Sequence, residues 1–353
     1  MPERLDLLIL GDANPDLVLT GDVEPAFGQM ERLLDAAHLT VGGSGAIVAC
    51  GAARLGLRVA FCGVVGDDHF GRYLHDELDR RGVDVRGLVV EPDRSTGVTV
   101  VLARPDDRAI LTHEGTIGDL RAALIDPELL ATAAHVHVAS YFLQRRLAPE
   151  LPALFERLRA DGVTISVDPN GDPSDRWDGG VRALLPQVDV FLPNATEAAR
   201  IAGTASLEDA VIALAADAGV VVAKAGPDGA VAASGDRIVR VPTPATDPVD
   251  ATGAGDSFDA GFLCSWLRGD SLERALAIAN ACGALSTRAL GGVDAQPTLE
   301  EALALADHPP TEGVRPAGSR DRSSRRTDGS RPARARRGVA IRPPGAPPAG
   351  DEP

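Results

Sequence analysis

The stretch Asp250-Ala251-Thr252-Gly253-Ala254-Gly255-Asp256-Ser257-Phe258-Asp259-Ala260-Gly261 joins a turn of small residues to an apolar helical pattern that runs on to Leu267. The first backbone N–H groups of a helix lack internal partners, and the helix dipole places partial positive charge there. Gly253 and Gly255 carry no side chain that would keep an anion away from those groups. The pattern therefore predicts a phosphate site at the N-terminus of this helix.

Asp256 places a carboxylate at the same spot. A fixed negative charge would repel a resting phosphate, but it has a purpose if it takes a proton from an alcohol that attacks the phosphate. The alternative interpretation is a glycine turn in which Asp256 is an ordinary N-terminal cap. An isolated G-A-G-D pattern favours the cap, whereas the other motifs of this chain favour the catalytic role.

The composition is typical of a globular protein outside the membrane. The chain has 353 residues, 44% apolar and 24% charged, enough for one large or two medium domains. No apolar run approaches the length of a membrane span, and the N-terminus reads as a first strand and not as a signal peptide. The four cysteines are scattered in apolar segments, which predicts free core thiols and a cytoplasmic location.

Charge is unevenly distributed along the chain. Residues 309–353 contain ten arginines against five acidic residues, so the rest of the chain is more acidic than the overall net charge of −16. An acidic body argues against nucleic acid as the main partner. The terminal segment is rich in Arg, Pro and Gly and poor in large apolar residues, and we predict that it is disordered. Lys224 is the only lysine of the chain.

Strand and helix patterns alternate over residues 1–308, which predicts an α/β domain with a mainly parallel sheet covered on both faces. Residues 96–112 interrupt the alternation with a hairpin around Arg104-Pro105-Asp106-Asp107. Together with a short strand at residues 17–20, this hairpin is a candidate lid. The last predicted helices are Gly255–Leu267 and Leu272–Leu290.

Two polar or glycine-rich loops follow the first strand. Asp12, Asn14 and Asp16 lie in a loop where α/β sheets bind ligands, and their side chains suit the hydroxyl groups of an acceptor. Gly42-Gly43 precede a helix of small residues and permit close approach of a ligand to the backbone. Each loop also has an ordinary explanation, in turn chemistry or in helix–sheet packing.

Five motifs in one order resemble those of the ribokinase-like (PfkB-type) carbohydrate kinases, and the resemblance covers roughly residues 5–297. The motifs are Gly42-Gly43 with the helix ending Ala53-Arg54-Leu55-Gly56, Gly63 to Gly71, Asn194-Ala195-Thr196-Glu197, Gly226-Pro227-Asp228-Gly229, and Asp250 to Asp256. The last one, D-x-T-G-A-G-D, is the most specific. The resemblance implies a three-layer α/β/α domain with a small β-sheet lid that phosphorylates a hydroxyl with ATP.

The resemblance also implies a role for individual residues. Asp256 would be the general base, and the N–H groups of Gly253, Ala254 and Gly255 would form the anion hole. Asn194 and Glu197 would act at the Mg²⁺ and phosphate end, with the metal held through water. The implied ATP-site residues are Asn194, Lys224, Gly226, Gly229 and Asn280, and the implied acceptor-site residues are Asp16, Gly42 and Gly43. Asp250 and Thr252 match positions that bind a monovalent cation such as K⁺ in some members.

Some positions leave the functional interpretation open. Asn194-x-x-Glu197 also reads as a helix capping box. Ile47 stands where the family's glycine motif usually has an Asn that reaches the sugar, so we expect Ile47 in the acceptor site to disfavour free ribose-like pentoses. Our prediction is a kinase of a small sugar or sugar-like polyol. The alternatives are a nucleoside kinase of the same fold and a non-catalytic ligand sensor. Lid-mediated homodimers occur in this family, so a homodimer through the lid is also expected.

Overall fold

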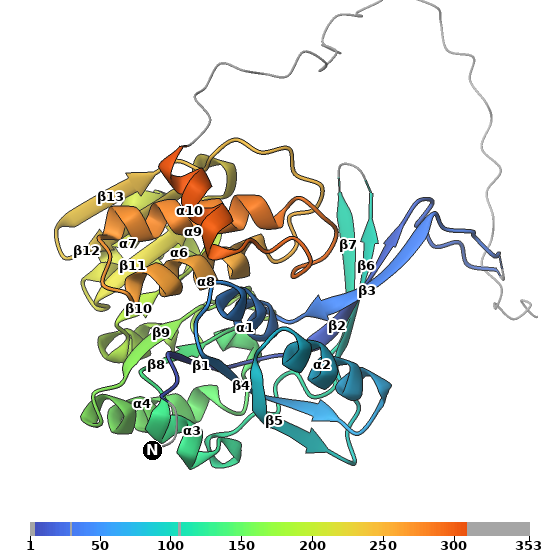
Figure 1. Cartoon of the computed structure of the whole chain (residues 1–353), viewed down its shortest axis with the longest axis horizontal. Coiled ribbons are helices and arrows are strands. Elements are labelled where there is room, and N and C mark those ends of the chain that lie inside the picture. The colour runs from blue at the N-terminus through green and yellow to red at the C-terminus, as the bar shows by residue number, and fades with distance from the viewer. Residues whose placement is uncertain (1–3, 29, 105–106, 309–353) are drawn as a thin grey trace, which may run out of the picture. The chain divides into compact units, whose positions relative to one another are not determined.

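Nine strands form the main sheet of a computed structural model, which describes residues 4–308 except 29 and 105–106 (Figure 1). The strands lie in the order β13-β12-β11-β10-β9-β8-β1-β4-β5. All neighbours from β11 to β5 are parallel, whereas β12 and β13 are antiparallel additions at one edge. Their bounds are β1 Leu7–Leu10, β4 Val59–Gly66, β5 Asp84–Glu91, β8 His135–Val138, β9 Thr164–Val167, β10 Val190–Phe191, β11 Val220–Lys224, β12 Ala230–Ser234 and β13 Arg237–Val241.

Two apolar cores lie on the two faces of this sheet. Strand β1 shows why: Leu8 and Leu10 belong to one core, Leu7 and Ile9 to the other, because successive side chains of a strand point to opposite faces. One face is covered by α3 Pro127–Thr132, α4 Leu151–Ala160, α5 Val181–Leu184, α6 Ala195–Ala202 and α7 Leu207–Ala215. The other is covered by α1 Ser44–Arg54, α2 His69–Arg80, α8 Ala254–Trp266, α9 Leu272–Ser286 and α10 Leu299–Asp307. The predicted three-layer α/β/α architecture is confirmed.

A second, four-stranded sheet stands beside the main sheet and is called the lid sheet below (Figure 1). Its order is β3-β2-β6-β7, with β2 and β6 parallel and the edge strands antiparallel to them. The strands are β2 Asn14–Thr20, β3 Ala36–Gly42, β6 Val98–Ala103 and β7 Arg108–His113. The small sheet was predicted, but β3 was not, because its sequence Ala-Ala-His-Leu-Thr-Val-Gly has few of the β-branched residues typical of strands.

The helix predictions were right in kind and inexact at the C-terminal end. Helix α9 ends at Ser286 and not at Leu290, and α10 follows where no further helix was expected. The predicted disordered segment 309–353 lies outside the described residues. Across the described part of the chain, no helix combines the length and apolar character needed to cross a membrane. All four cysteines are buried free thiols.

Candidate active site

Strand β2 of the lid sheet begins with the polar residues that were predicted to bind the acceptor. Asn14 Nδ2 donates to Asp16 Oδ1 at 2.8 Å and to Thr99 Oγ1 of β6 at 3.1 Å, and all three residues are at least nine-tenths buried. Gly42 makes room for this carboxylate, because a Cβ there would come within 2.1 Å of Asp16 Oδ1. Burial raises the pKa of Asp16 to about 7, and the negative charges of Asp12 and Asp256 add to the rise.

The N-terminus of α1 connects this group to the predicted base. Asp12 accepts hydrogen bonds from the N–H groups of Ser44 and Gly45, both at 3.2 Å. The Ser44 hydroxyl hydrogen-bonds the Asp256 carboxylate, and Asn170 Nδ2 donates to Ser44 Oγ at 3.2 Å. Ser44 therefore holds the Asp256 side chain beside the start of α1.

The N-terminus of α8 carries Asp256 in its first turn, as predicted, but the residue does not cap the helix. Gly253 occupies the N-cap position with a left-handed backbone (φ 70°) and provides no side-chain cap. Burial raises the pKa of Asp256 to about 7, the Asp168 carboxylate adds to the rise, and Lys224 and the Ser44 hydrogen bond oppose it. A carboxylate with a pKa near neutrality suits a general base, since it can both accept and release a proton.

Residues 250–253, directly before α8, form a tight turn. It is called the phosphate turn below because it lies at the predicted phosphate site. Asp250 Oδ1 accepts from the N–H and the hydroxyl of Thr252 at 2.9 and 2.8 Å, and Asp250 Oδ2 accepts from the N–H of Gly291 at 2.9 Å. A Cβ on Gly253 would lie 2.7 Å from Gly292 Cα, so only glycine fits there. Ile47 is 3% exposed and packs against Gly253 and Gly292, which places it beneath this turn.

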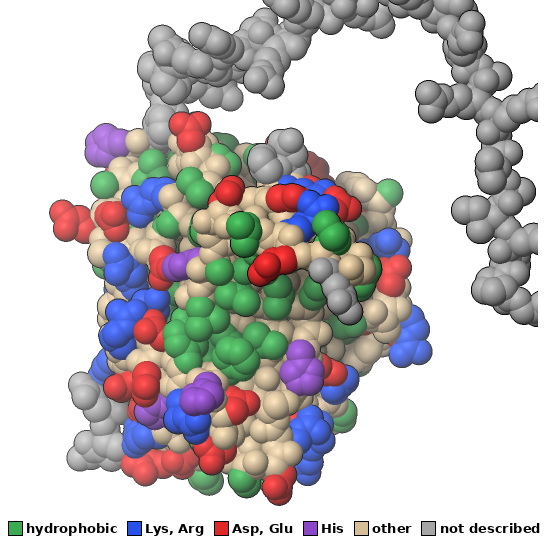
Figure 2. All heavy atoms as spheres, turned by 90° about the vertical axis from the view of Figure 1, so that its right-hand side faces the viewer, with side chains coloured by type: hydrophobic (Ala, Val, Ile, Leu, Met, Phe, Trp, Pro, Cys, Tyr) green, Lys and Arg blue, Asp and Glu red, His purple; other side chains and the backbone are tan. Residues whose placement is uncertain are grey.

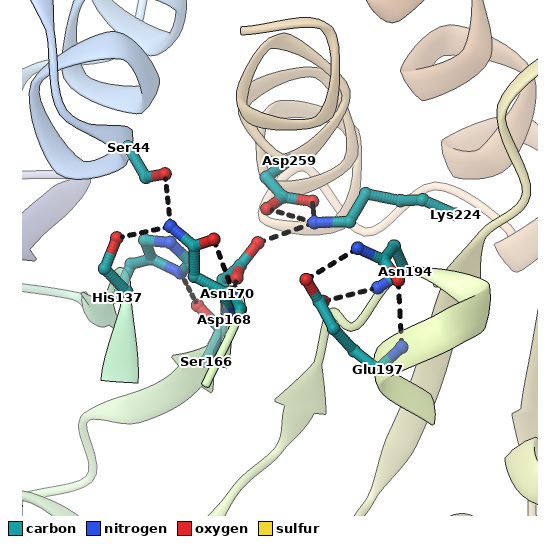
Figure 3. Close-up of polar contacts among 11 residues, drawn as sticks. Ser44, His137, Ser166, Asp168, Asn170, Asn194, Glu197, Lys224 and Asp259 are labelled. Carbon is teal, nitrogen blue, oxygen red and sulfur yellow. Dashed lines mark hydrogen bonds and ion pairs between the residues drawn. The ribbon is translucent and has the colours of Figure 1, made fainter. Parts of the chain in front are cut away.

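Lys224 lies below α8 between two buried carboxylates (Figure 3). Its Nζ donates to Asp168 Oδ2 at 2.6 Å and to Asp259 Oδ2 at 2.9 Å, and its side chain is 11% exposed. Burial works against the ammonium, but the two carboxylates outweigh it and raise the pKa of Lys224. Gly255 lies directly above, since a Cβ there would be 3.9 Å from Lys224 Nζ. Lys224 thus supplies positive charge under the predicted anion hole.

Asp168 and Asp259 both contact Lys224, but their pKa values are shifted in opposite directions. Burial alone would raise the pKa of Asp168, but Lys224 and hydrogen bonds from Asp259 and Lys224 lower it overall. Burial raises the pKa of Asp259 well above its usual range, against the influence of Lys224. The pair therefore combines an ionised Asp168 with an Asp259 that retains its proton more strongly, which keeps the buried charge small.

The predicted nucleotide-site residues converge on the connector between β13 and α8. Asn280 Nδ2 donates to Val241 O at 2.9 Å, and Thr243 Oγ1 donates to Gly226 O at 2.8 Å. Gly229 has a positive φ of 97°, and a Cβ there would meet Val241 O at 2.1 Å. Gly226, Gly229 and Asn280 therefore all lie beside residues Val241–Thr243, although Asn280 is far from the two glycines in the sequence.

Asn194 and Glu197 form the capping box of α6 that was considered as an alternative. The Asn194 N–H donates to Glu197 Oε2 at 2.8 Å, and the Glu197 N–H donates to Asn194 Oδ1 at 2.9 Å (Figure 3). Burial raises the pKa of Glu197 to about 7, and the charge of Asp168 adds to the rise. A cation beside Glu197 would favour the ionised form of its carboxyl group.

Three residues of this constellation were not assigned a role from the sequence: Ser44, Asp259 and Arg108. Arg108 of β7 donates from Nη1 to Thr252 Oγ1 at 2.9 Å and lies 3.7 Å from Asp250 Oδ1. Asp259 had one sequence signal, because a single buried lysine needs an acidic partner. Arg108 had none, since the contact joins the lid sheet to the turn before α8, and the sequence does not show that these two segments are adjacent.

The comparisons with known proteins agree with this geometry. The pattern of the family described as pfkB family carbohydrate kinase matches residues 5–299. The chain belongs to this family. It is 34% identical over 303 residues to the ATP-dependent ribose-1-phosphate kinase of Halopiger xanaduensis, covering 85% of this chain and 97% of that one. It is 32% identical to the fructokinase of Klebsiella pneumoniae, covering 83% and 96% of the two chains.

A solved structure of the family carries the nucleotide. The E. coli protein assigned as ribokinase II, in complex with ATP and Mg²⁺, superposes with a TM-score of 0.76 at 25% identity, covering 86% of this chain and 99% of that one. The chain is accordingly an ATP-dependent carbohydrate kinase, a transferase with an alcohol acceptor. The family assignment leaves the acceptor and the roles of individual residues to be argued from the site itself.

Proposed function

We propose that this kinase transfers the γ-phosphate of ATP to a hydroxyl of a small sugar or sugar-like polyol, with Asp256 as the general base. The observation that supports this most is the pair of carboxylates with pKa values near 7, Asp16 on the lid sheet and Asp256 at the start of α8. They are close enough for the charge of Asp256 to raise the pKa of Asp16. One can hold an acceptor hydroxyl while the other removes the proton of the hydroxyl that attacks.

The backbone of the phosphate turn would receive the transferred group. Gly253, Ala254 and Gly255 present the first turn of α8 to it, with Lys224 beneath. Preorganised N–H donors and a fixed positive charge stabilise the charge that develops on the phosphoryl oxygens. Gly226, Gly229 and Asn280 would hold the rest of ATP at the β13–α8 connector.

A divalent cation fits beside Asn194 and Glu197. The carboxyl group of Glu197 and the amide oxygen of Asn194 are hard oxygen donors, and their capping bonds leave lone pairs for water molecules of the ion. Mg²⁺ keeps most of its waters and would neutralise charge on the phosphates. A monovalent cation at Asp250 and Thr252 was expected from the resemblance alone, and these two side chains already contact Arg108.

A nucleoside is the second candidate acceptor, and a cavity that could take its base lies beside β7 of the lid sheet, although Asp16, Gly42 and Asp256 are not among the residues that line it. The cavity has a volume of about 960 Å³, and apolar side chains such as Ile117, Tyr141, Phe142 and Leu143 line much of it. Aromatic and aliphatic walls suit a nucleobase. Ile47 adds no hydrogen-bonding group, so the expected discrimination against free ribose stands as a prediction.

An assay of ADP release with a panel of acceptors tests the proposal. The panel contains ribose, ribose 1-phosphate, fructose, a deoxy sugar acid and adenosine. We expect a sugar or sugar phosphate to reach a kcat/KM of about 10⁴ M⁻¹s⁻¹ or more, an ordinary enzyme efficiency. Adenosine as the best acceptor would favour the nucleoside kinase, and binding without turnover for the whole panel would favour the sensor. Ribose at that efficiency would contradict the role given to Ile47.

We also propose that two copies associate through the lid sheet, within the cytoplasm. Figure 2 views the molecule from the lid side and shows hydrophobic side chains gathered on this face. Exposed apolar side chains of the lid segments are Phe27, Leu33, Leu39, Ile110 and Leu111. An exposed apolar edge strand such as β7 favours pairing with a second chain. Sedimentation should give a dimer that Ile110→Arg dissociates, and a wild-type monomer at micromolar concentration would contradict it.

A further inference from the structure

One side chain of the lid sheet contacts the phosphate turn. Arg108 begins β7 and pairs with Ala103 of β6. Its Nη1 donates to Thr252 Oγ1 at 2.9 Å and lies 3.7 Å from Asp250 Oδ1, with side-chain exposures of 44% for Arg108 and 12% for Asp250. The guanidinium therefore lies at the mouth of the site, on a carboxylate that is mostly buried.

Asp250 organises the turn that Arg108 contacts. Its two carboxylate oxygens hold Thr252 on one side and the N–H of Gly291 on the other. Gly292, the next residue, packs against Gly253 at the start of α8. The position of the first turn of α8 thus depends on Asp250.

These residues do not fit a monovalent cation as long as Arg108 stays in place. Asp250 Oδ1 already accepts two hydrogen bonds, and the Thr252 hydroxyl donates to Asp250 and accepts from Arg108. A second positive charge on the same carboxylate would repel the guanidinium at a distance of a few ångströms. The guanidinium brings the same single positive charge as the ion would.

We propose that Arg108 takes the place of the monovalent cation and positions the anion hole when the lid sheet is closed. This rests on the proposed function, in which the start of α8 receives the phosphoryl group. Asp16, which would hold the acceptor, and Arg108, which contacts the phosphate turn, are on the same four-stranded sheet. Closure of the lid over the acceptor then also neutralises Asp250, so that acceptor binding and phosphate-site geometry are coupled.

The opposite edge strand of the lid sheet, β3, contacts the loop of residues 291–294, which Asp250 holds through the N–H of Gly291. His38 of β3 lies with Nε2 2.9 Å from Asp294 Oδ2, and Thr40 packs against Gly291. Both edge strands, β3 and β7, thus reach the segments that position α8. An exposed ion pair such as that of Arg108 contributes little to overall stability, which suits a contact that must open in every cycle.

The test compares Arg108→Ala, Arg108→Lys and a control, Arg104→Ala. Arg104 is on the other side of the same hairpin turn, and its Nη2 pairs with Glu24 Oε2 at 2.6 Å and not with Asp250 or Thr252. Arg108→Ala should lower kcat about 10- to 100-fold, less than the 10³-fold or more for an arginine that contacts the γ-phosphate itself. Arg108→Lys should retain part of the activity, and Arg104→Ala should match the wild type.

Cation dependence gives the second measurement. At equal ionic strength the wild type and Arg104→Ala should work equally well in K⁺ and in tetramethylammonium, whereas Arg108→Ala should be activated by K⁺. Hydrogen exchange without ligand should show faster exchange at amides 250–256 in Arg108→Ala, and K⁺ should slow it again. Strong K⁺ activation of the wild type, or an Arg108→Ala variant with wild-type kcat and exchange, would overturn the proposal. An inactive wild type with every acceptor would instead overturn the proposed function.

Discussion

Helices α6 and α8 each have an acidic residue three positions after the N-cap, but the two acidic side chains make different contacts. In α6, Asn194 is the N-cap and Glu197 is three residues later; in α8, Gly253 is the N-cap and Asp256 is three residues later. Both acidic groups have pKa values raised to about 7 by burial. Glu197 folds back onto the N–H of Asn194 and completes a capping box, whereas Asp256 takes a hydrogen bond from Ser44 on another helix.

The residue at the N-cap explains the difference. The amide oxygen of Asn194 accepts from the N–H of Glu197, and the carboxylate of Glu197 accepts from the N–H of Asn194. These two backbone donors at the start of α6 are therefore not available to an anion. Gly253 has no side chain, so the corresponding donors of α8 remain available to an anion. The same change leaves Asp256 free for the base role proposed above. In this proposal, a glycine in the N-cap position is what separates the catalytic helix start from the capped one.

Asp256→Asn should have the largest effect of the variants that test this comparison. The amide cannot take the proton of the acceptor, so kcat should fall about 10²- to 10⁴-fold, the usual contribution of a general base. Binding of ATP, measured by calorimetry, should survive because the backbone of the turn is unchanged. A kcat within about threefold of the wild type would show that Asp256 is not the base.

Gly253→Ala should disturb the start of α8 through a steric clash. Its Cβ would meet Gly292 Cα at 2.7 Å, so the turn must move, and loss of one anion-hole donor costs about 10²- to 10³-fold in kcat. Gly203→Ala is the matched control, because Gly203 has nearly the same φ (71° against 70°) and no neighbour within 4 Å. Both variants carry about 1–2 kcal/mol of backbone strain. Equal kcat in the two would remove the steric argument.

Glu197→Gln separates the capping role of Glu197 from a role at the metal. Glutamine also completes a capping box, so the thermal midpoint should stay close to that of the wild type. Loss of the charge should raise the Mg²⁺ concentration for half-maximal activity about 10-fold, as for residues that orient metal ligands. Glu301→Gln, in the second capping box at Thr298 of α10, is the control and should leave the Mg²⁺ requirement unchanged. Identical curves for both variants would make Glu197 a cap and nothing more.

Deletion of residues 309–353 should have the smallest effect. The last element of the described residues is α10, which ends at Asp307, and the deleted segment is poor in apolar residues. We expect kcat/KM within about twofold of the full chain and a thermal midpoint within about 2 °C, which corresponds to roughly 0.5 kcal/mol. A large loss in either quantity would show that the segment packs on the kinase domain.

Local chemistry explains which parts could be predicted from the sequence. The turn at Gly253–Asp256 and the capping box at Asn194 are set by neighbours within four residues, so both were recognisable. Helix α10 had the same kind of signal in Thr298-x-x-Glu301, which the prediction missed. The motifs also place Asp16 and Asp256 in one site, although their proximity is a result of the fold.

Contacts between distant segments could not be predicted. Lys224 was expected to line the ATP site, but the structure surrounds it with Asp168 and Asp259, which come from a loop and a helix far away in the sequence. Ile47 was expected in the acceptor site; the structure packs it against Gly253 and Gly292, and its effect on the acceptor stays a prediction. At both positions the residue type indicated a place near the site. The direction in which the side chain points depends on packing between helices and strands, which the sequence does not show.

The pH dependence of kcat/KM for the acceptor, at saturating ATP and Mg²⁺, tests the central claim most directly. In the proposed mechanism the deprotonated form of Asp256 is the base, and its pKa is raised to about 7. The account therefore predicts a rate that falls at least tenfold per pH unit below 7 and levels off above it, and a shallower limb in Asp256→Asn, where only Asp16 with its pKa of about 7 is left to titrate. A wild-type profile that is flat from about pH 5.5 to 8.5, or a limb of unchanged slope in Asp256→Asn, would contradict it.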